Sequence, residues 1–227
     1  MPGPLLYLFD IDGTLIGSPR GVGRRALERA CHEACGLHGA MQGIVLHGNT
    51  DPSIIEEAFV AQLGRAPTAA EFEAVLSAYL RHLEAELLPE DSVLRMPQVE
   101  ETITALARRG VAMGLATGNI EAGARLKLER VGLWHHFPFG GFGSDARERA
   151  ELVRVAIARA QGRSGVTFTA DAIWVIGDTP RDITAAHAAG VRAIGVATGP
   201  YDEAALAAAG ADRVFPTLEP FLASLNN

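Results

Sequence analysis

Apolar and polar positions along this chain show two different patterns, one typical of buried strands and one typical of helices. The change from one pattern to the other divides the chain into segments. An unbroken apolar run from Leu5 to Phe9 has the length and make-up of a buried strand in a parallel sheet. Between residues 17 and 92, apolar positions recur every three or four residues, as they do on one face of a helix. After that block, short apolar runs alternate with helical stretches. The predicted strands are 111–116, 137–143, 172–176, 192–197 and 213–215, and the predicted helices are 98–109, one ending at 131, 149–161, 180–189 and 202–209.

The helical block carries its own start and stop signals. A first helix is predicted over 20–38, and Thr50-Asp51-Pro52 opens a second one that ends before Gly64. The spacing of Thr68 and Glu71 is a capping box that opens a third. We therefore predict an α/β protein with a doubly wound, Rossmann-like parallel sheet, in which residues 1–16 and 93–227 form the core. Residues 17–92 are predicted to be an inserted α-helical domain.

Charge and composition exclude several classes of function. The chain has 227 residues and a net charge of −7, which argues against a nucleic-acid-binding surface and against attachment to an anionic membrane. No apolar stretch approaches the roughly 20 residues that a membrane span needs. Cys31 and Cys35 lie four apart in a helical pattern, as small packing residues in a reducing compartment do. We expect a cytoplasmic protein, either a monomer or a homodimer.

Polar residues cluster where three of the predicted strands end. Asp10 and Asp12 follow the first strand two residues apart, and Asp178 follows the strand at 172–176, with Asp182 one helical turn further on. The carboxyl ends of parallel strands lie at one edge of the sheet, so these carboxylates are expected to converge. Several carboxylates together would repel one another unless a cation compensates them, and Mg²⁺ is the hard cation that suits oxygen ligands. The site therefore points to Mg²⁺ chemistry.

The third strand end offers a place for a phosphate. Thr117, Gly118 and Asn119 lie at a strand-to-helix turn, where backbone N–H groups at a helix N-terminus bind anions. A metal site beside a phosphate cradle and a free carboxylate favours phosphoryl transfer, in which one carboxylate acts as nucleophile and a second as general acid and base.

At this point the chain resembles a known family. The segments FDIDGTL, LATGN and IGDTPRD, in that order, resemble the first, second and fourth motifs of the haloacid dehalogenase superfamily. The resemblance implies that Asp10 is the nucleophile and a Mg²⁺ ligand, and that Asp12 is the general acid/base with its backbone carbonyl on the metal. It further implies that Thr117, with Gly118 and Asn119, binds the phosphoryl group. The block at 17–92 falls where the family has its helical cap.

The resemblance assigns the remaining acidic residues and leaves one cation open. Asp178 would bind Mg²⁺, and Asp182 would support that end of the site through water or a hydrogen bond. The family's third motif usually has a lysine at the start of the helix before the fourth motif, and this chain has none there. Arg149 stands in that place as a catalytic and phosphate-binding cation, with Arg147 as the alternative. Lys127, the only lysine, lies earlier in the sequence and is expected to pack along a surface.

The loop before the second predicted helix is the candidate for choosing the substrate. His47-Gly48-Asn49-Thr50-Asp51 resembles a segment of some phosphoglycolate-phosphatase-like caps, so that His47, Asn49 and Thr50 would meet the non-phosphate part of a substrate. An ordinary helix cap at Thr50 or Asp51 explains the same residues equally well. We leave both interpretations open.

The expected function is Mg²⁺-dependent hydrolysis of a small phosphorylated metabolite through an aspartyl-phosphate, with phosphoglycolate as the first candidate. A sugar-phosphate mutase of the same family would use the same aspartates. A haloacid dehalogenase needs neither Asp12 nor Asp178, and a phosphonate hydrolase would need a cap lysine. A non-catalytic binding or regulatory module is the alternative from another class, since a fold does not dictate function.

Overall fold

The core of the protein is one parallel sheet. The computed structural model describes residues 4–225, and its six-stranded sheet has the order β5-β4-β1-β6-β7-β8. The strands are β1 (Leu6–Phe9), β4 (Ala112–Ala116), β5 (Gly140–Gly141), β6 (Ile173–Gly177), β7 (Arg192–Val196) and β8 (Arg213–Phe215). β1 lies at the centre, paired in parallel with β4 on one side and β6 on the other. The predicted α/β class with a parallel sheet and an inserted helical region is confirmed.

Both faces of the sheet are covered, as the unbroken apolar run of β1 predicts. Alternate residues of a strand point to opposite faces. Tyr7 and Phe9 belong to the apolar cluster that includes residues of α4 (Val99–Arg108), α5 (Glu121–Arg130) and α9 (Leu218–Leu225). Leu6 and Leu8 belong to the cluster formed with α6 (Arg149–Ser164), α7 (Pro180–Ala188) and α8 (Glu203–Ala208). Short 3₁₀ turns complete this part of the fold at Trp134–His136 and Ala170–Ala172.

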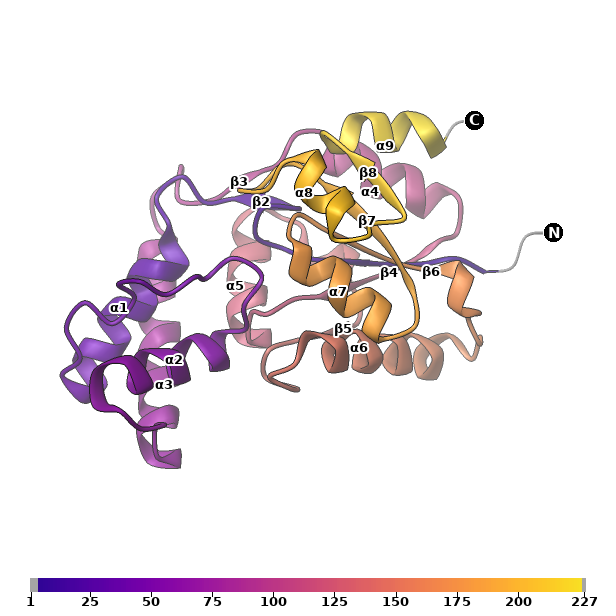
Figure 1. Cartoon of the computed structure of the whole chain (residues 1–227). Coiled ribbons are helices and arrows are strands. Elements are labelled where there is room, and N and C mark those ends of the chain that lie inside the picture. Colours follow the sequence, from indigo (N-terminus) through magenta and orange to yellow (C-terminus); the bar gives the residue numbers. More distant parts are fainter. Residues whose placement is uncertain (1–3, 226–227) are drawn as a thin grey trace.

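The inserted region is helical and lies beside the carboxyl ends of the strands. It contains α1 (Val22–Cys35), α2 (Asp51–Leu63) and α3 (Ala69–Glu86), which Figure 1 shows together at one side of the sheet in indigo and purple. α1 packs along α3, and α3 also touches α5 of the core. A two-stranded antiparallel ribbon joins the two parts, made by β2 (Ile16–Gly17) and β3 (Leu94–Arg95). The chain therefore enters and leaves the helical region side by side.

Local capping chemistry explains several helix ends. Thr50 accepts a hydrogen bond from the N–H of Ser53 at the start of α2, and Thr68 forms the predicted capping box with Glu71 at the start of α3. The prediction of a first helix over 20–38 was too long, because Gly36 adopts a left-handed conformation with φ 70° and ends α1 at Cys35. α6 runs on to Ser164, beyond the predicted end at 161, until Gly165 ends it in the same way.

Two elements were not predicted from the pattern, and one was overestimated. The β2–β3 ribbon has only two residues in each strand, and α9 is a short C-terminal helix with Leu218 and Phe221 buried. The strand expected over 137–143 is reduced to Gly140–Gly141. Elements this short depend on tertiary contacts, so a periodicity of residues along the chain does not mark them.

Candidate active site

The residues that follow β1, β4 and β7 form the floor of a cavity, and the helical region forms its roof. The cavity has a volume of about 410 Å³. Asp10, Asp12, Thr117 and Arg149 line it from the core, and His47, Asp51 and Tyr79 line it from the helical region. A cavity of this size, where the strands of a parallel sheet end, is a typical place for a small ligand.

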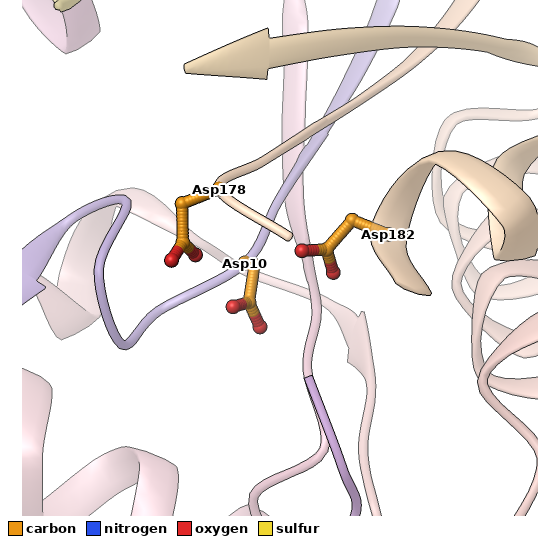
Figure 2. Close-up of side chains that lie close together, drawn as sticks. All are labelled: Asp10, Asp178 and Asp182. Atoms are coloured by element: carbon orange, nitrogen blue, oxygen red, sulfur yellow. The ribbon is translucent and has the colours of Figure 1, made fainter. Parts of the chain in front are cut away.

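Three buried carboxylates converge beside this cavity, and Asp10 is the one of them that lines it. Asp10 follows β1, Asp178 follows β6, and Asp182 lies in the first turn of α7; Figure 2 shows their carboxylates gathered in one place. One oxygen from each lies within 4.8 Å of an oxygen of the other two. Such an arrangement is unfavourable without a compensating cation or proton.

The chain makes special room for the Asp178 carboxylate. A Cβ atom at Gly13 would lie 2.3 Å from its Oδ2, and a Cβ atom at Gly199 would lie 1.8 Å from the same oxygen, so both positions need glycine. Oδ1 accepts a hydrogen bond of 3.3 Å from the Thr14 hydroxyl, whereas the buried Oδ2 has no hydrogen-bond partner. Burial, with the nearby carboxylates of Asp182 and Asp10, raises the pKa of Asp178 to about 9.

Asp10 and Asp182 are held by the same arginine. The guanidinium of Arg149 lies 3.2 Å from Asp10 Oδ1 and also donates to Asp182 Oδ1. Burial and the Asp182 carboxylate raise the pKa of Asp10 to about 7, against the lowering effect of Arg149. Asp182 Oδ2 accepts hydrogen bonds from the backbone N–H and the hydroxyl of Thr179 in a capping box. Asp182 is thus already partnered by protein groups.

The donor set fits a hard divalent cation. All the candidate ligands are carboxylate oxygens, and the unpartnered Oδ2 of Asp178 is an acceptor that the described residues leave unsatisfied. A cation of the Mg²⁺ type binds through one or two carboxylates and completes its shell with water and phosphate oxygens. Asp10 and Asp178 are the pair best placed to hold it.

The two arginines proposed for the third motif lie in different places. Arg149, at the start of α6, is the one that reaches Asp10, with only 11% of its side chain exposed. Arg147 instead forms an ion pair with Glu56 of α2, on the outside of the molecule. Arginine suits the buried position because its fork of donors contacts two carboxylates at once.

The turn after β4 is tightly packed against the helical region. A Cβ atom at Gly118 would lie 2.1 Å from the backbone oxygen of Asn49, and the Gly118 carbonyl accepts a 2.8 Å hydrogen bond from the N–H of Asp51. The Asp51 carboxylate accepts a 2.9 Å bond from the N–H of Ile120 at the start of α5. A protein carboxylate therefore already occupies part of the helix N-terminus that was expected to bind phosphate.

Asn119 connects other side chains of the site. Its Nδ2 group donates to Thr117 Oγ1 at 2.9 Å and to Asp12 Oδ2 at 2.8 Å. Its Oδ1 accepts a 2.7 Å hydrogen bond from Lys127 Nζ. The side chain of Asn119 thus holds its neighbours in place and has no free polar atom of its own to offer a phosphate.

The expectation that Lys127 packs along a surface was wrong. Lys127 is only 4% exposed, and its Nζ lies 2.7 Å from Asp12 Oδ2. It shares the buried face of α5 with Ala124 and Leu128. The sequence contained a signal for the burial of Lys127. The lysine lies four residues after Gly123 and three after Ala124, so it shares one helix face with these small residues. Burial would raise the pKa of Asp12, but the Lys127 ammonium and the hydrogen bonds from Lys127 and Asn119 hold that pKa below its ordinary value.

The loop of the helical region places its candidate residues in different surroundings. His47 and Asn49 line the cavity. The Asn49 amide donates to Glu57 at 2.8 Å. Thr50 is 1% exposed and caps α2, so its hydroxyl serves the helix and is not part of the cavity wall.

Two polar residues of the cavity wall were not among the predicted substrate-binding residues. Burial raises the pKa of Asp51 to about 6, partly offset by Lys127 and by the hydrogen bond from Ile120. The Tyr79 hydroxyl lies beside Asp51, fully buried and without a hydrogen bond of normal geometry. Tyr79 lies on the buried face of α3 with Val75 and Leu83, and only the packing of α3 on α5 turns it toward the cavity.

The fold and this site define a class of protein. The family model of haloacid dehalogenase-like hydrolases matches residues 7–196, and the chain belongs to that family. It is therefore a hydrolase, and its site is that of a phosphatase of this family.

Curated relatives agree with this class. A phosphoglycolate phosphatase of Rhodospirillum rubrum is 31% identical over 218 residues, which cover 93% of this chain and 87% of that protein. A probable phosphatase of Dickeya dadantii is 27% identical over 204 residues, which cover 86% of this chain and 81% of that protein. Among solved structures, a predicted phosphoglycolate phosphatase from Haemophilus somnus superposes with a TM-score of 0.74 at 23% identity, covering 99% of both chains. That last similarity shows the fold.

The helices give no sign of a membrane anchor. Within residues 4–225, every helix is too short or too polar to cross a bilayer.

Proposed function

We propose that this protein hydrolyses small phosphomonoesters with the help of Mg²⁺, through a phosphorylated Asp10. The single observation that carries the proposal is the unpartnered Oδ2 of Asp178, for which Gly13 and Gly199 leave room, close to the carboxylate of Asp10. Mg²⁺ held by Asp10 and Asp178 would neutralise charge on the phosphoryl group and favour the ionised forms of both carboxylates. The metal-binding roles of Asp12, through its backbone carbonyl, and of Asp182 remain predictions from the resemblance.

The residues of the chain supply the covalent steps. Arg149 holds Oδ1 of Asp10, which leaves Oδ2 to attack phosphorus. The ester P–O bond breaks, and the leaving oxygen takes a proton from Asp12. Asp12 then accepts a proton from a water molecule that attacks the phosphorus, which releases phosphate and restores Asp10. We infer that the Thr117 hydroxyl and the Gly118 N–H bind the non-bridging oxygens.

Phosphoglycolate is the first substrate to test, because several curated relatives carry that name at 26–31% identity. The cavity has room for it, and His47 and Asn49 line the cavity from the helical region. We infer that these two residues contact the non-phosphate part of the substrate, and that the chain region 17–92 acts as a cap over the site.

The test is phosphate release from a panel of small phosphomonoesters that includes phosphoglycolate, with Mg²⁺ and with EDTA. Asp10→Asn is the diagnostic variant. Asp171→Asn is its matched control, because Asp171 is an exposed carboxylate just before β6, at the opposite end of that strand from Asp178.

We expect Mg²⁺-dependent release that is lost in Asp10→Asn, with a loss of at least about 10³-fold, and retained in Asp171→Asn. Release that persists in Asp10→Asn would exclude the aspartyl-phosphate. If folded wild-type protein releases phosphate from none of the esters, the proposal is wrong, and sugar phosphates with a bisphosphate activator become the substrates to try.

A further inference from the structure

The chain's only lysine is buried beside the second aspartate of the site. Lys127 lies on α5, outside every segment that resembles a family motif, and 5% of its side chain is exposed. Its Nζ donates to Asp12 Oδ2 at 2.7 Å and to Asn119 Oδ1 at 2.7 Å. A buried ammonium is unfavourable unless it is paired, so these two partners determine where it lies.

The two carboxylate oxygens of Asp12 differ in their hydrogen bonds. Oδ2 accepts from Lys127 at 2.7 Å and from Asn119 Nδ2 at 2.8 Å. No donor among residues 4–225 contacts Oδ1, and 41% of the Asp12 side chain remains exposed to the cavity. One oxygen is therefore anchored by two donors while the other faces the place where substrate binds. That is the arrangement that a carboxylate needs if it is to transfer protons at one atom in a fixed position.

The same network reaches the residue expected to bind phosphate. Asn119 bonds to Thr117 Oγ1 at 2.9 Å with the same amide nitrogen that bonds to Asp12. Every polar atom of the Asn119 side chain is thus engaged by Lys127, Asp12 or Thr117. Lys127 is the cation at one end of this hydrogen-bond network. Among the described residues, no other cationic side chain lies within hydrogen-bond distance of Asp12.

The helical region encloses the ammonium from the other side. A Cβ atom at Gly23 of α1 would lie 3.5 Å from Lys127 Nζ, and Tyr79 of α3 lies against Gly123 on the same helix as the lysine. This packing leaves only 5% of the lysine side chain exposed, which strengthens its interaction with the Asp12 carboxylate.

We propose that Lys127 is a positioning residue for the proton transfers, acting through Asp12. This inference rests on the proposed function. Lys127 and Asn119 hold Oδ2 so that Oδ1 points at the ester oxygen. The negative charge of a phosphate ester bound beside Asp12 favours protonation of that carboxyl from solvent. Oδ1 then gives this proton to the leaving oxygen as the P–O bond breaks, and it takes a proton back from the attacking water.

The proposal predicts a dependence on the leaving group. An alkyl phosphate such as phosphoglycolate releases a strongly basic alkoxide, which needs a proton as it leaves. 4-Nitrophenyl phosphate releases a weakly basic phenolate that leaves without one. A defect in proton delivery therefore slows the first substrate much more than the second, whereas a general structural defect slows both alike.

The experiment compares kcat and KM on both substrates for four proteins besides the wild type. Lys127→Met removes the ammonium at nearly the same side-chain length, and Lys127→Arg keeps the charge. Asp12→Asn shows the full loss of the acid/base group. Arg125→Met is the matched control, since Arg125 lies on the same helix, is exposed and, within residues 4–225, pairs only with Glu129.

We expect Lys127→Met to lower kcat for the alkyl phosphate by about 10²-fold, with less than about 5-fold on 4-nitrophenyl phosphate and little change in KM. Lys127→Arg should recover part of the loss, and Arg125→Met should resemble the wild type. Equal losses on both substrates, or a change confined to KM, would overturn the proposal.

A crystal structure of Lys127→Met gives a test that does not need activity. The Asp12 carboxylate should leave its position or occupy several, while Asp10 and Asp178 stay in place. An Asp12 side chain that does not move overturns the proposal. If Lys127→Met does not fold, Lys127→Gln takes its place, because it removes the charge but can still donate one hydrogen bond. A wild type inactive on all esters would count against the proposed function, whereas the position of Asp12 still tests this inference.

Discussion

Replacing Asp178 with asparagine should make the metal-free protein more stable at neutral pH and remove its response to Mg²⁺. The reason is the cost of a buried carboxyl with an unpartnered Oδ2. Its pKa rises from 3.8 to about 9 in the folded protein, through burial and two neighbouring carboxylates. Asparagine has the same shape and no charge, so it should fit between Gly13 and Gly199 without the cost of ionisation.

The sign and size of the effect follow from linkage. Because the folded-state pKa is the higher one, the contribution of Asp178 to stability is fully present below about pH 4 and is lost as the pH rises toward 9. Each pH unit in that window removes about 1.4 kcal/mol. Between pH 5 and pH 7 the free energy of unfolding of the wild type should therefore fall by about 3 kcal/mol relative to Asp178→Asn.

Mg²⁺ should remove the stability advantage of Asp178→Asn over the wild type. A ligand that binds only the folded state at 100 times its dissociation constant adds about 2.7 kcal/mol to stability. The wild type should gain stability of that order at pH 7, and the variant should gain little. The net result is a variant that is more stable than the wild type in EDTA and loses that advantage when the cation is present.

Urea unfolding followed by circular dichroism measures these quantities, at pH 5 and pH 7 in EDTA and at pH 7 with Mg²⁺. Asp171→Asn is the control, because its exposed carboxyl has a lowered pKa and is ionised in both states at both pH values. The reasoning is refuted if the variant loses stability relative to the wild type between pH 5 and pH 7. It is refuted equally if the variant keeps the full response to Mg²⁺.

Two further predictions concern the packing of the site. Arg149→Met should destabilise the protein by about 3–5 kcal/mol at pH 8 in urea unfolding, because it leaves two buried carboxylates without their cation; Arg149→Lys should cost less, and equal losses would contradict the account. Gly118→Ala should destabilise by about 1–3 kcal/mol and lower phosphate release, because its Cβ would lie 2.1 Å from the Asn49 carbonyl oxygen. Gly162→Ala, on an open face of α6 with nothing within 4 Å, should instead stabilise by about 0.5–1 kcal/mol, and similar results for both alanines would refute the packing argument.

Patterns that are local in the chain were enough to predict the architecture. The run from Leu5 to Phe9 predicted a strand covered on both faces, and β1 is the central strand of the sheet. The caps at Thr50 and Thr68 marked the starts of α2 and α3. Such signals depend on the dihedral preferences and hydrogen bonds of neighbouring residues, so they act before any tertiary contact forms.

The sequence by itself also determined that acidic residues would meet at one edge of the sheet, although Asp12, which was expected among them, pairs with Lys127 instead. Asp10, Asp178 and Asp182 follow parallel strands, and the topology of a parallel sheet brings such positions to one edge whatever the details of packing. The resemblance to a family supplied their expected roles.

Only the tertiary structure decided which partners the cationic residues and the residues of the helical region contact. Arg149 and Arg147 are two residues apart at the start of one helix, yet one reaches Asp10 and the other pairs with Glu56. Lys127 is brought to Asp12 across 115 positions of sequence. Long side chains reach in many directions, and their contacts depend on how helices pack, which no local pattern specifies.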